Sequence, residues 1–507
     1  MVKPLVLIIM DGWGINPKTE GNAIKLAKSP NLKKMCQEYP CTQLSASGLD
    51  VGLPAGLMGN SEVGHLNIGA GRIVWQEITR IDKAVQDGSF YKIPEFVSAI
   101  EHVKSNKSAL HLMGLVSDGG VHSTDTHYFA LLELARRNGL SRDQVMFHAA
   151  MDGRDTPPNS GVGYIERLQK EMDIINMGRI ATISGRYYLM DRDKRWERLQ
   201  LAYDALTAGA GLKASEPVQA VKDAYARGET DEFIKPIVLD NTKRIGDNDA
   251  VIFFNFRADR AREITRALTD PGFSDFPRRV FPRIHYTMMT VYDEKLNLPV
   301  AFKPLALKNI LSEVLSGKGL KQLRIAETEK YAHVTYFFNG GQEKAYPGED
   351  RALIPSSKVA TYDMKPEMSA PEVTSQVLKA VAENKYDVII MNYANCDMVG
   401  HTGVLPAAIK AVEVVDDCVG QVVNAVLAKG GAALVTADHG NADEMLDYKN
   451  GGPHTYHTTN LVPFTLVGEG FKGKKLRAGG KLCDIAPTML KILGIDKPSD
   501  MEGQSLI

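Results

Sequence analysis

The sequence lacks any long hydrophobic run. No stretch approaches the ~20 apolar residues that a membrane-spanning helix needs. The apolar run over residues 5–10 is too short for the core of a secretion signal and is followed directly by Asp11. We therefore interpret this run as a buried strand, and we expect a soluble, cytoplasmic protein that does not associate with a membrane.

Cysteine is also scarce. The chain has five, and none of them forms the C-x-x-C spacing of a zinc site. Their odd number and irregular spacing favour reduced and mostly buried thiols, as in intracellular proteins. The five are Cys36, Cys41, Cys396, Cys418 and Cys483.

Neither sign of charge is in excess. Lys and Arg number 60 against 61 Asp and Glu, which gives a formal net charge of −1 at pH 7. A general nucleic-acid binder usually carries a basic excess, so we expect no nucleic-acid partner. An anionic ligand would have to be met by local clusters of basic side chains or by metal ions.

Short apolar runs that end in polar turns are abundant. Continuous apolar strands separated by helical patterns are typical of parallel sheets covered on both faces. Residues 409–427 repeat apolar side chains at steps of three and four, which predicts an amphipathic helix. The predicted strands cover 5–10, 387–391 and 432–436 near the ends of the chain, and 109–116, 144–151, 179–183 and 250–254 in its middle.

These runs predict an α/β protein with two domains and mainly parallel sheets. At 507 residues the chain is too long for a single ordinary core. Pro299 and Pro304 mark one boundary, and the other lies near Trp75. We predict one domain from residues 1–76 and 299–507, with a second domain, residues 77–298, inserted into it.

Metal-ligating side chains follow the strands of the first domain. Asp397 and His401 are four residues apart, which places them on one face of a helical turn. One Asp after a strand is more often a helix N-cap, but several such groups at the carboxyl ends of strands favour a site for two divalent ions. Mixed nitrogen and oxygen ligands suit Mn²⁺ or Zn²⁺ and, less well, Mg²⁺. The candidates are Asp11, Asp397, His401, Asp438, His439 and His457.

Ser61 is a candidate nucleophile. It lies between Gly59 and Gly64, which permit a tight turn, and a helix beginning here would present N–H groups to an anion. A bound dication can lower the pKa of such a hydroxyl and orient it. By itself the motif would equally fit an ordinary capping serine. His65 and His454 have no clear role, and we interpret both as structural.

The second domain places basic side chains in turns after its predicted strands. Arginine can bind a carboxylate or a phosphate through two hydrogen bonds. One such residue would fit a solvated, salt-bridged surface, whereas several in similar turns favour an anion site. They are Arg154, Arg186, Arg192, Arg257 and Arg260, with His122 in a neighbouring loop.

The motifs together resemble cofactor-independent phosphoglycerate mutases of the alkaline phosphatase superfamily. In the first domain the matching segments are residues 11–14, 58–65, 397–402 and 437–441. In the second they are 121–123, 152–155, 184–188, 190–192 and 256–260. The resemblance covers nearly the whole chain, and it implies an alkaline-phosphatase-like core with an inserted substrate-binding domain.

The resemblance also implies a set of residue roles. One metal is held by Asp397, His401 and His457, and the other by Asp11, Ser61, Asp438 and His439. Ser61 is phosphorylated, Asp155 transfers a proton, and Lys330 reaches the phosphate. His122, Asp155 and the five arginines named above hold the substrate.

These roles predict the interconversion of 3-phosphoglycerate and 2-phosphoglycerate through a phosphoserine. We expect two divalent ions, Mn²⁺ above all, no bisphosphoglycerate, and a monomer whose two domains close on the substrate. A metal-dependent phosphatase or sulfatase and a phosphopentomutase share the metal core and are the alternatives. A non-catalytic binding protein is a further alternative, which loss of Ser61 or a metal ligand would favour.

Overall fold

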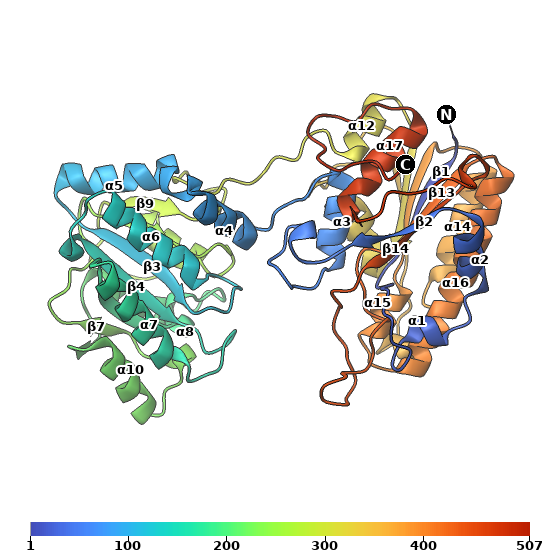
Figure 1. The fold of residues 1–507 in the computed structure, drawn as a ribbon. Helices are drawn as coiled ribbons and strands as arrows, with labels where there is room; N and C mark the ends of the chain where they lie inside the picture. The colour runs from blue at the N-terminus through green and yellow to red at the C-terminus, as the bar shows by residue number, and fades with distance from the viewer. Residues whose placement is uncertain (1) are drawn as a thin grey trace. The chain divides into compact units, whose positions relative to one another are not determined.

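The computed structural model describes residues 2–507, and the chain divides into two compact units. Unit 1 contains the residues up to Gln76 together with Ala306–Ile507, and unit 2 contains Glu77–Leu305. Each unit is built on one sheet of mainly parallel strands with helices on both faces (Figure 1). The predicted α/β class is therefore confirmed, and unit 2 lies between the two segments of unit 1 in the sequence.

The sheet of unit 1 has eight strands in the order β11-β10-β12-β1-β13-β14-β2-β15. β1 lies between β12 and β13 and is parallel to both, whereas β14 runs antiparallel to β13 and to β2. The strands are β1 Leu5–Met10, β2 Cys41–Ser45, β10 Gln322–Glu327, β11 Glu349–Ile354, β12 Val388–Tyr393, β13 Ala432–Thr436, β14 Val462–Val467 and β15 Gly480–Lys481.

Helices cover both faces of this sheet, so β1 is buried along its whole length, as its uninterrupted apolar sequence predicts. Figure 1 shows α3, α12 and α17 on one face and α1, α2, α14 and α16 on the other. The helices are α1 Ala23–Leu26, α2 Pro30–Glu38, α3 Ser61–Ala70, α12 Leu311–Gly317, α13 Thr328–Ala332, α14 Ala370–Ala382, α15 Asn395–Gly400, α16 Leu405–Ala428 and α17 Ile485–Leu493.

The sheet of unit 2 has seven strands in the order β6-β7-β5-β4-β3-β8-β9, and only the β5–β7 pair is antiparallel. Alternate side chains of β3 enter two separate cores. Leu110 and Leu112 pack on one face, and Met113 and Leu115 pack on the other. The strands are β3 Leu110–Val116, β4 Val145–Met151, β5 Arg179–Gly185, β6 Leu212–Ala214, β7 Ile237–Leu239, β8 Ala250–Phe253 and β9 His285–Met288.

The helices of unit 2 divide between these two cores. Apolar side chains of α5, α6, α7 and α10 join the core that contains Leu110, while those of α9 and α11 join the core that contains Met113. The helices are α4 Glu77–Asp87, α5 Pro94–Asn106, α6 Asp125–Arg137, α7 Gly161–Ile174, α8 Arg186–Leu189, α9 Trp196–Thr207, α10 Pro217–Ala226 and α11 Arg262–Thr269.

The second boundary between the units falls after Leu305, not after Leu298 as we inferred from the sequence. Residues beyond Leu298 remain with unit 2 because their backbone continues to pair with the end of its sheet. Val300 forms a parallel bridge with Met288, and the N–H of Phe302 donates to the carbonyl of Met289 at 2.8 Å. Pro304 therefore lies next to the boundary, whereas Pro299 lies within unit 2.

The expectation of reduced thiols is wrong for one pair. Cys36 and Cys41 form a disulfide with their Cα atoms 5.7 Å apart. The two lie where the chain turns from the end of α2 into β2, a proximity that their spacing in the sequence did not reveal. Cys396, Cys418 and Cys483 are free and buried, as expected.

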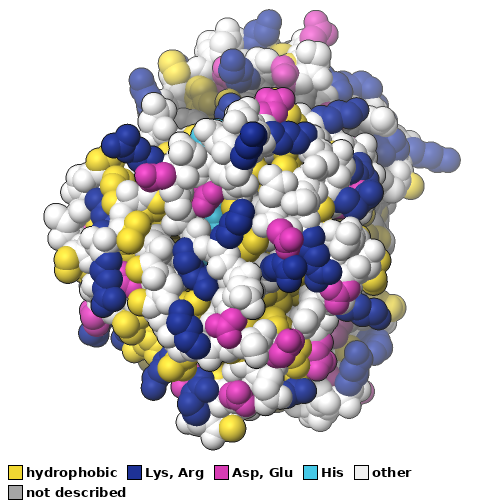
Figure 2. Space-filling view, turned by 90° about the vertical axis from the view of Figure 1, so that its left-hand side faces the viewer, with side chains coloured by type: hydrophobic (Ala, Val, Ile, Leu, Met, Phe, Trp, Pro, Cys, Tyr) yellow, Lys and Arg dark blue, Asp and Glu magenta, His cyan; other side chains and the backbone are white. Residues whose placement is uncertain are grey.

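The surface agrees with a nearly neutral composition. Figure 2 shows one face of unit 2, on which Lys and Arg side chains are interspersed with Asp and Glu and do not form a single basic stripe. Within residues 2–507, no helix combines the length and the apolar character needed to cross a membrane.

Candidate functional site

Unit 1 gathers its acidic and imidazole side chains at the carboxyl ends of β1, β12 and β13. The register pairs Ile9 of β1 with Asn392 of β12 and with Thr436 of β13, so these neighbouring parallel strands end at one edge of the sheet. Asp11 follows β1, Asp397 lies on α15 just after β12, and Asp438 follows β13. The topology therefore brings together residues that lie more than 400 positions apart in the sequence.

Ser61 is the first residue of α3 and lies within this cluster. The side chain of Asn60 caps the helix by accepting from the N–H of Val63 at 2.9 Å. Ser61 Oγ is 3.1 Å from Asp11 Oδ1 and 3.0 Å from His439 Nε2, and the side chain is buried. Ser61 thus starts a helix without serving as its cap, contrary to the plain capping role that the motif alone would fit.

Glycine at position 64 allows α3 to approach the strand end. A Cβ atom there would lie 2.8 Å from Cβ of Asp438 and 2.9 Å from its carbonyl oxygen. Any side chain at this position would push the helix away from the sheet. Gly64 therefore allows α3 to bring Ser61 close to the carboxylates.

Three ligand-type atoms converge around Asp397. Its Oδ1 lies 3.1 Å from Nε2 of His401 and 3.1 Å from Nε2 of His457. The Nδ1 atoms of these imidazoles are each 2.8 Å from a backbone carbonyl, that of Thr455 for His401 and that of Gly59 for His457. A carbonyl can only accept, so Nδ1 carries a proton in each ring and Nε2 is the nitrogen that faces Asp397, the orientation that a metal site requires.

Lys330, in the middle of α13, brings a positive charge into the same cluster. Its Nζ donates to Asp11 Oδ1 at 2.9 Å, to Ser61 Oγ at 2.7 Å and to Asp397 Oδ2 at 2.7 Å. Burial opposes the charge on Lys330, but Asp11 and Asp397 together raise its pKa above the usual value. Burial would likewise raise the pKa of Asp11, yet Lys330 and His439 hold that pKa well below its ordinary range.

The electrostatic field of the cluster favours cations. Burial would lower the pKa of His439, but Asp438, Asp11 and Asp397 raise it to about 10. Asp438 Oδ2 is completely buried and makes no hydrogen bond with the described residues, although His65 Nδ1 lies 3.2 Å away. A buried carboxylate oxygen without a donor is costly unless a cation occupies the remaining space, so the donor set fits divalent metal ions.

Ligand-type atoms within metal-binding distance of one another form three overlapping groups. They are Asp397 with His401 and His457, Asp11 with Asp397 and His439, and Asp11 with His65 and Asp438. The structure thus brings together all seven predicted metal-site residues of unit 1, and it adds His65, which we had interpreted as structural. His454 contacts none of them through its side chain in any described interaction; its backbone N–H donates to the carbonyl of Met445.

Unit 2 has its own polar cluster, in the loops after β3, β4 and β5. Arg186 is buried at its centre and donates through Nη1 to Asp152 Oδ1 and to Asp155 Oδ2, both at 2.6 Å. Its Nη2 lies 3.0 Å from His122 Nε2. Because a guanidinium can only donate, His122 accepts and is neutral, and burial together with Arg186 lowers the pKa of His122 to about 4.

The other predicted arginines lie around this centre. Arg192 donates to Asp259 Oδ2 at 2.7 Å, and Arg257 Nε lies 3.3 Å from Asp259 Oδ1 with half of its side chain exposed. Arg260 is buried, and burial together with the positive charges of Arg186, Arg192 and Arg154 lowers its pKa. Arg154 pairs with Glu232, so the predicted arginines of unit 2 form a cluster in which most have a carboxylate partner.

Sequence reasoning missed several residues that support the unit 1 cluster. Asn441 Nδ2 donates to Asp397 Oδ1 at 2.9 Å, and Asn392 Nδ2 donates to Asp11 Oδ2 at 2.8 Å. Asp443 is buried and accepts from Thr458 Oγ1 and from Asn460 Nδ2, and so connects the loop of His439 to the loop of His457. Asn441 lies within a matching segment, whereas Asn392 and Asp443 lie outside those segments, and the roles of all three depend on contacts across the fold.

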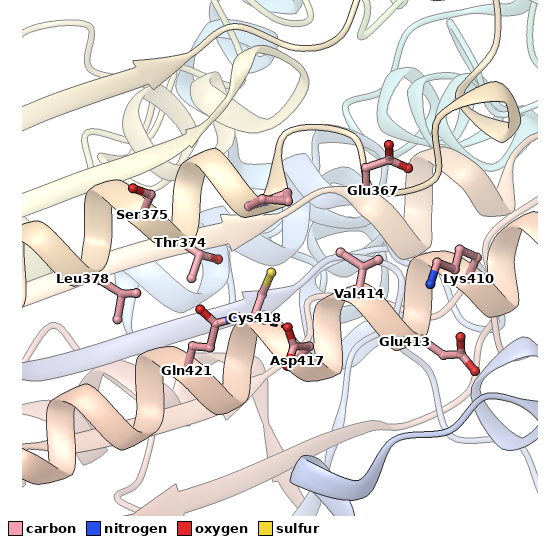
Figure 3. Close-up of a pocket in the computed structure, with 11 residues that line it drawn as sticks. Glu367, Thr374, Ser375, Leu378, Lys410, Glu413, Val414, Asp417, Cys418 and Gln421 are labelled. Carbon is pink, nitrogen blue, oxygen red and sulfur yellow. Dashed lines mark hydrogen bonds between the residues drawn. The ribbon is translucent and has the colours of Figure 1, made fainter.

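A cavity of about 660 Å³ lies elsewhere in unit 1, between α14 and α16. Figure 3 shows Thr374, Ser375 and Leu378 facing Val414, Cys418 and Gln421 across it. None of its lining residues belongs to either cluster. Thr374 Oγ1, at one wall of the cavity, is already hydrogen-bonded to the hydroxyl of Tyr393.

Comparison with known proteins identifies the class first. A family model described as the metalloenzyme superfamily matches residues 3–497, so the chain belongs to that superfamily. A 2,3-bisphosphoglycerate-independent phosphoglycerate mutase of Acetivibrio thermocellus is 57% identical over 100% of this chain and 99% of its own length. One of Clostridium beijerinckii is 56% identical over 100% of this chain and 99% of its own length.

A solved structure agrees with these relatives. Leishmania mexicana phosphoglycerate mutase, crystallised at low cobalt concentration, is 33% identical with a TM-score of 0.62 and matches 100% of this chain and 98% of that one. The chain is a member of the 2,3-bisphosphoglycerate-independent phosphoglycerate mutase family. The resemblance inferred from the motifs is confirmed.

Proposed function

We propose that this enzyme interconverts 3-phosphoglycerate and 2-phosphoglycerate through a phosphoserine at Ser61. The observation that carries the proposal is the environment of that hydroxyl. Ser61 Oγ is buried within hydrogen-bonding distance of a carboxylate, an imidazole and an ammonium group, those of Asp11, His439 and Lys330. The names and the high identity of the relatives support the same reaction.

Two divalent ions fit the donor set of unit 1. We assign one to Asp397, His401 and His457, and the other to Asp11, Ser61, Asp438 and His439. Mixed nitrogen and oxygen ligands favour Mn²⁺. When bound, such ions act as Lewis acids that lower the pKa of the serine hydroxyl and neutralise charge on the phosphoryl oxygens.

The residues of unit 1 prepare Ser61 for attack on the phosphate. Asp11 is placed to accept the hydroxyl proton, since Ser61 Oγ donates to its Oδ1 at 3.1 Å. Lys330 remains protonated because its pKa is raised, so its ammonium offsets negative charge on the phosphoryl oxygens. The bond from phosphorus to the glycerate oxygen breaks as the bond to Ser61 Oγ forms.

The residues of unit 2 hold glycerate and transfer its proton. Arg257 and Arg192 bind the carboxylate, while Arg154, Arg186, Arg260 and His122 complete the polar surroundings. Asp155 donates a proton to the departing glycerate oxygen and later accepts one from the other hydroxyl. Arg186 orients Asp155 for both steps by donating to its Oδ2.

Retention of glycerate separates a mutase from a phosphatase with the same metal core. Water must reach the phosphoserine in a phosphatase, whereas a mutase must return the phosphoryl group to the same glycerate. The arginine-rich cluster of unit 2 fits a carboxylated substrate and supports the mutase. We further propose that no bisphosphoglycerate is needed and that the enzyme is cytoplasmic. We also propose that it acts as a monomer, since one chain supplies every group named above.

The test is 3-phosphoglycerate conversion by metal-stripped enzyme. EDTA treatment should abolish conversion, and added Mn²⁺ should restore it with no bisphosphoglycerate present. Activity that depends on bisphosphoglycerate, or that survives complete removal of metal, would contradict the proposal. Stoichiometric release of inorganic phosphate would identify a phosphatase instead.

A further inference from the structure

His65 and Asn392 form a buried bridge behind the ligand set that contains Ser61. His65 lies one helical turn after Ser61 in α3, and its Nδ1 is 2.8 Å from the carbonyl oxygen of Ser61. Its Nε2 is 3.1 Å from Asn392 Nδ2, and the same amide nitrogen donates to Asp11 Oδ2 at 2.8 Å. Asp438 Oδ2 lies 3.2 Å from His65 Nδ1. Both side chains of the bridge are buried.

The direction of each hydrogen bond in the bridge follows from its two ends. The Ser61 carbonyl can only accept, so His65 Nδ1 carries the proton. The Asp11 carboxylate accepts, so the amide nitrogen of Asn392 faces it, and the second hydrogen of that nitrogen is donated to His65 Nε2. The imidazole is therefore neutral, with one nitrogen donating and the other accepting.

The bridge contacts the ligands proposed for one metal ion and none of those unique to the other. Asp11, Ser61 and Asp438 all contact His65 or Asn392. His401 and His457 are oriented by carbonyls of Thr455 and Gly59, and Asp397 accepts from Asn441. The two proposed ions thus have separate supporting residues.

We propose that His65 and Asn392 are positioning residues for the ion held by Asp11, Ser61, Asp438 and His439. His65 holds the backbone of Ser61 and lies against Asp438, while Asn392 orients Asp11. Loss of such supporting hydrogen bonds lowers metal affinity by about 10- to 100-fold. The inference rests on the proposed two-metal function. It assigns a role to His65 and Asn392, neither of which is among the proposed metal ligands.

The experiment measures Mn²⁺ binding to the full chain, with free Mn²⁺ followed by electron paramagnetic resonance. The parent should bind two ions. His65→Ala should lower the affinity for one of them by about 10- to 100-fold and leave the affinity for the other unchanged. His65→Asn should bind more tightly than His65→Ala, because an asparagine amide can occupy the place of Nδ1 and donate to the Ser61 carbonyl. If His65→Ala does not fold, His65→Asn and Asn392→Leu provide the comparison.

Asn67 supplies the matched control. It is equally buried in the same helix, but it donates to the carbonyls of Val51 and Val63 and contacts no ligand. Asn67→Ala should lower the thermal unfolding temperature while both Mn²⁺ affinities stay at the parent value. Adding His457→Ala to each variant removes the ion assigned to Asp397, His401 and His457. The affinity that remains then belongs to the ion that the bridge supports.

The results separate this inference from the proposed function. A parent protein that binds fewer than two Mn²⁺ ions would overturn the two-metal proposal and the inference with it. Two tight ions in the parent and also in His65→Ala would overturn the inference alone. An equal loss of affinity for both ions, or the same loss in Asn67→Ala, would show general destabilisation and would also overturn the inference.

Discussion

Lys330 Nζ donates to Ser61 Oγ at 2.7 Å, although 269 positions separate the two residues in the sequence. The lysine belongs to the short helix after β10, and the serine begins α3. Their contact places a permanent positive charge beside the proposed nucleophile. Lys330 also contacts Asp11 and Asp397, one ligand from each proposed metal set, so a single ammonium group adjoins both.

Ser61→Ala should reduce mutase activity by about 10⁴-fold or more, because the phosphoenzyme cannot form without the hydroxyl. Brief incubation with substrate should yield a phosphopeptide that contains Ser61 in the parent only. Ser47→Ala is the control, since Ser47 lies in the preceding loop and donates only to the carbonyl of Thr459. Normal turnover by the Ser61 variant would exclude this residue as the nucleophile.

Activity should fall as pH decreases from about 8 to 6, because protons and metal ions compete for the imidazoles. The pKa of His439 is raised to about 10, and Asp397 raises that of His401. Protons therefore bind these groups more tightly than a free imidazole, and metal affinity should rise with pH throughout this range. Rate profiles at two Mn²⁺ concentrations check this, since excess Mn²⁺ should move the acid limb to lower pH. An acid limb that does not move with Mn²⁺ concentration would indicate another titrating group.

Asp155→Asn should lower turnover by about 10²- to 10⁴-fold, because the amide can still accept from Arg186 but cannot transfer a proton. The Michaelis constant should change much less than the rate. Asp118→Asn is the control, since Asp118 is exposed and accepts from the hydroxyl of Tyr164 without contacting Arg186 in any described hydrogen bond. Equal losses in the two variants would remove Asp155 from the proton-transfer role.

Arg257→Ala should lower mutase activity by about 10- to 100-fold, the effect of losing one or two hydrogen bonds to a charged group. It should also raise the fraction of turnovers that release inorganic phosphate, because glycerate is held less firmly. Arg257 suits this test better than Arg186, whose removal would leave the buried Asp152 unpaired. Arg137→Ala, at an exposed ion pair on α6, is the control.

Carbon-labelled glycerate added to the medium gives a second measure of retention. The parent enzyme should exclude it from the product, because the phosphoryl group returns to the glycerate from which it came. Arg257→Ala should incorporate some of the labelled glycerate into the product. Efficient incorporation by the parent would contradict retention and would require a mechanism in which glycerate leaves during each turnover.

Local patterns determined most of the fold. The strands at 5–10 and 432–436 coincide with β1 and β13, because a strand buried on both faces must be apolar along its length. The amphipathic pattern at 409–427 lies within α16, although that helix continues beyond it at both ends. The candidate ligands were visible for the same reason, since polar residues directly after apolar strands stand out from their surroundings.

Tertiary structure alone decided which of these residues meet and which others support them. Periodicity reports which side of an element is buried but does not specify which element packs against it. The disulfide of Cys36 with Cys41 depends on how the chain turns from α2 into β2. His65 looked structural until the fold placed it against Ser61, Asp438 and Asn392, because the role of a buried imidazole depends on the atoms that face its two nitrogens.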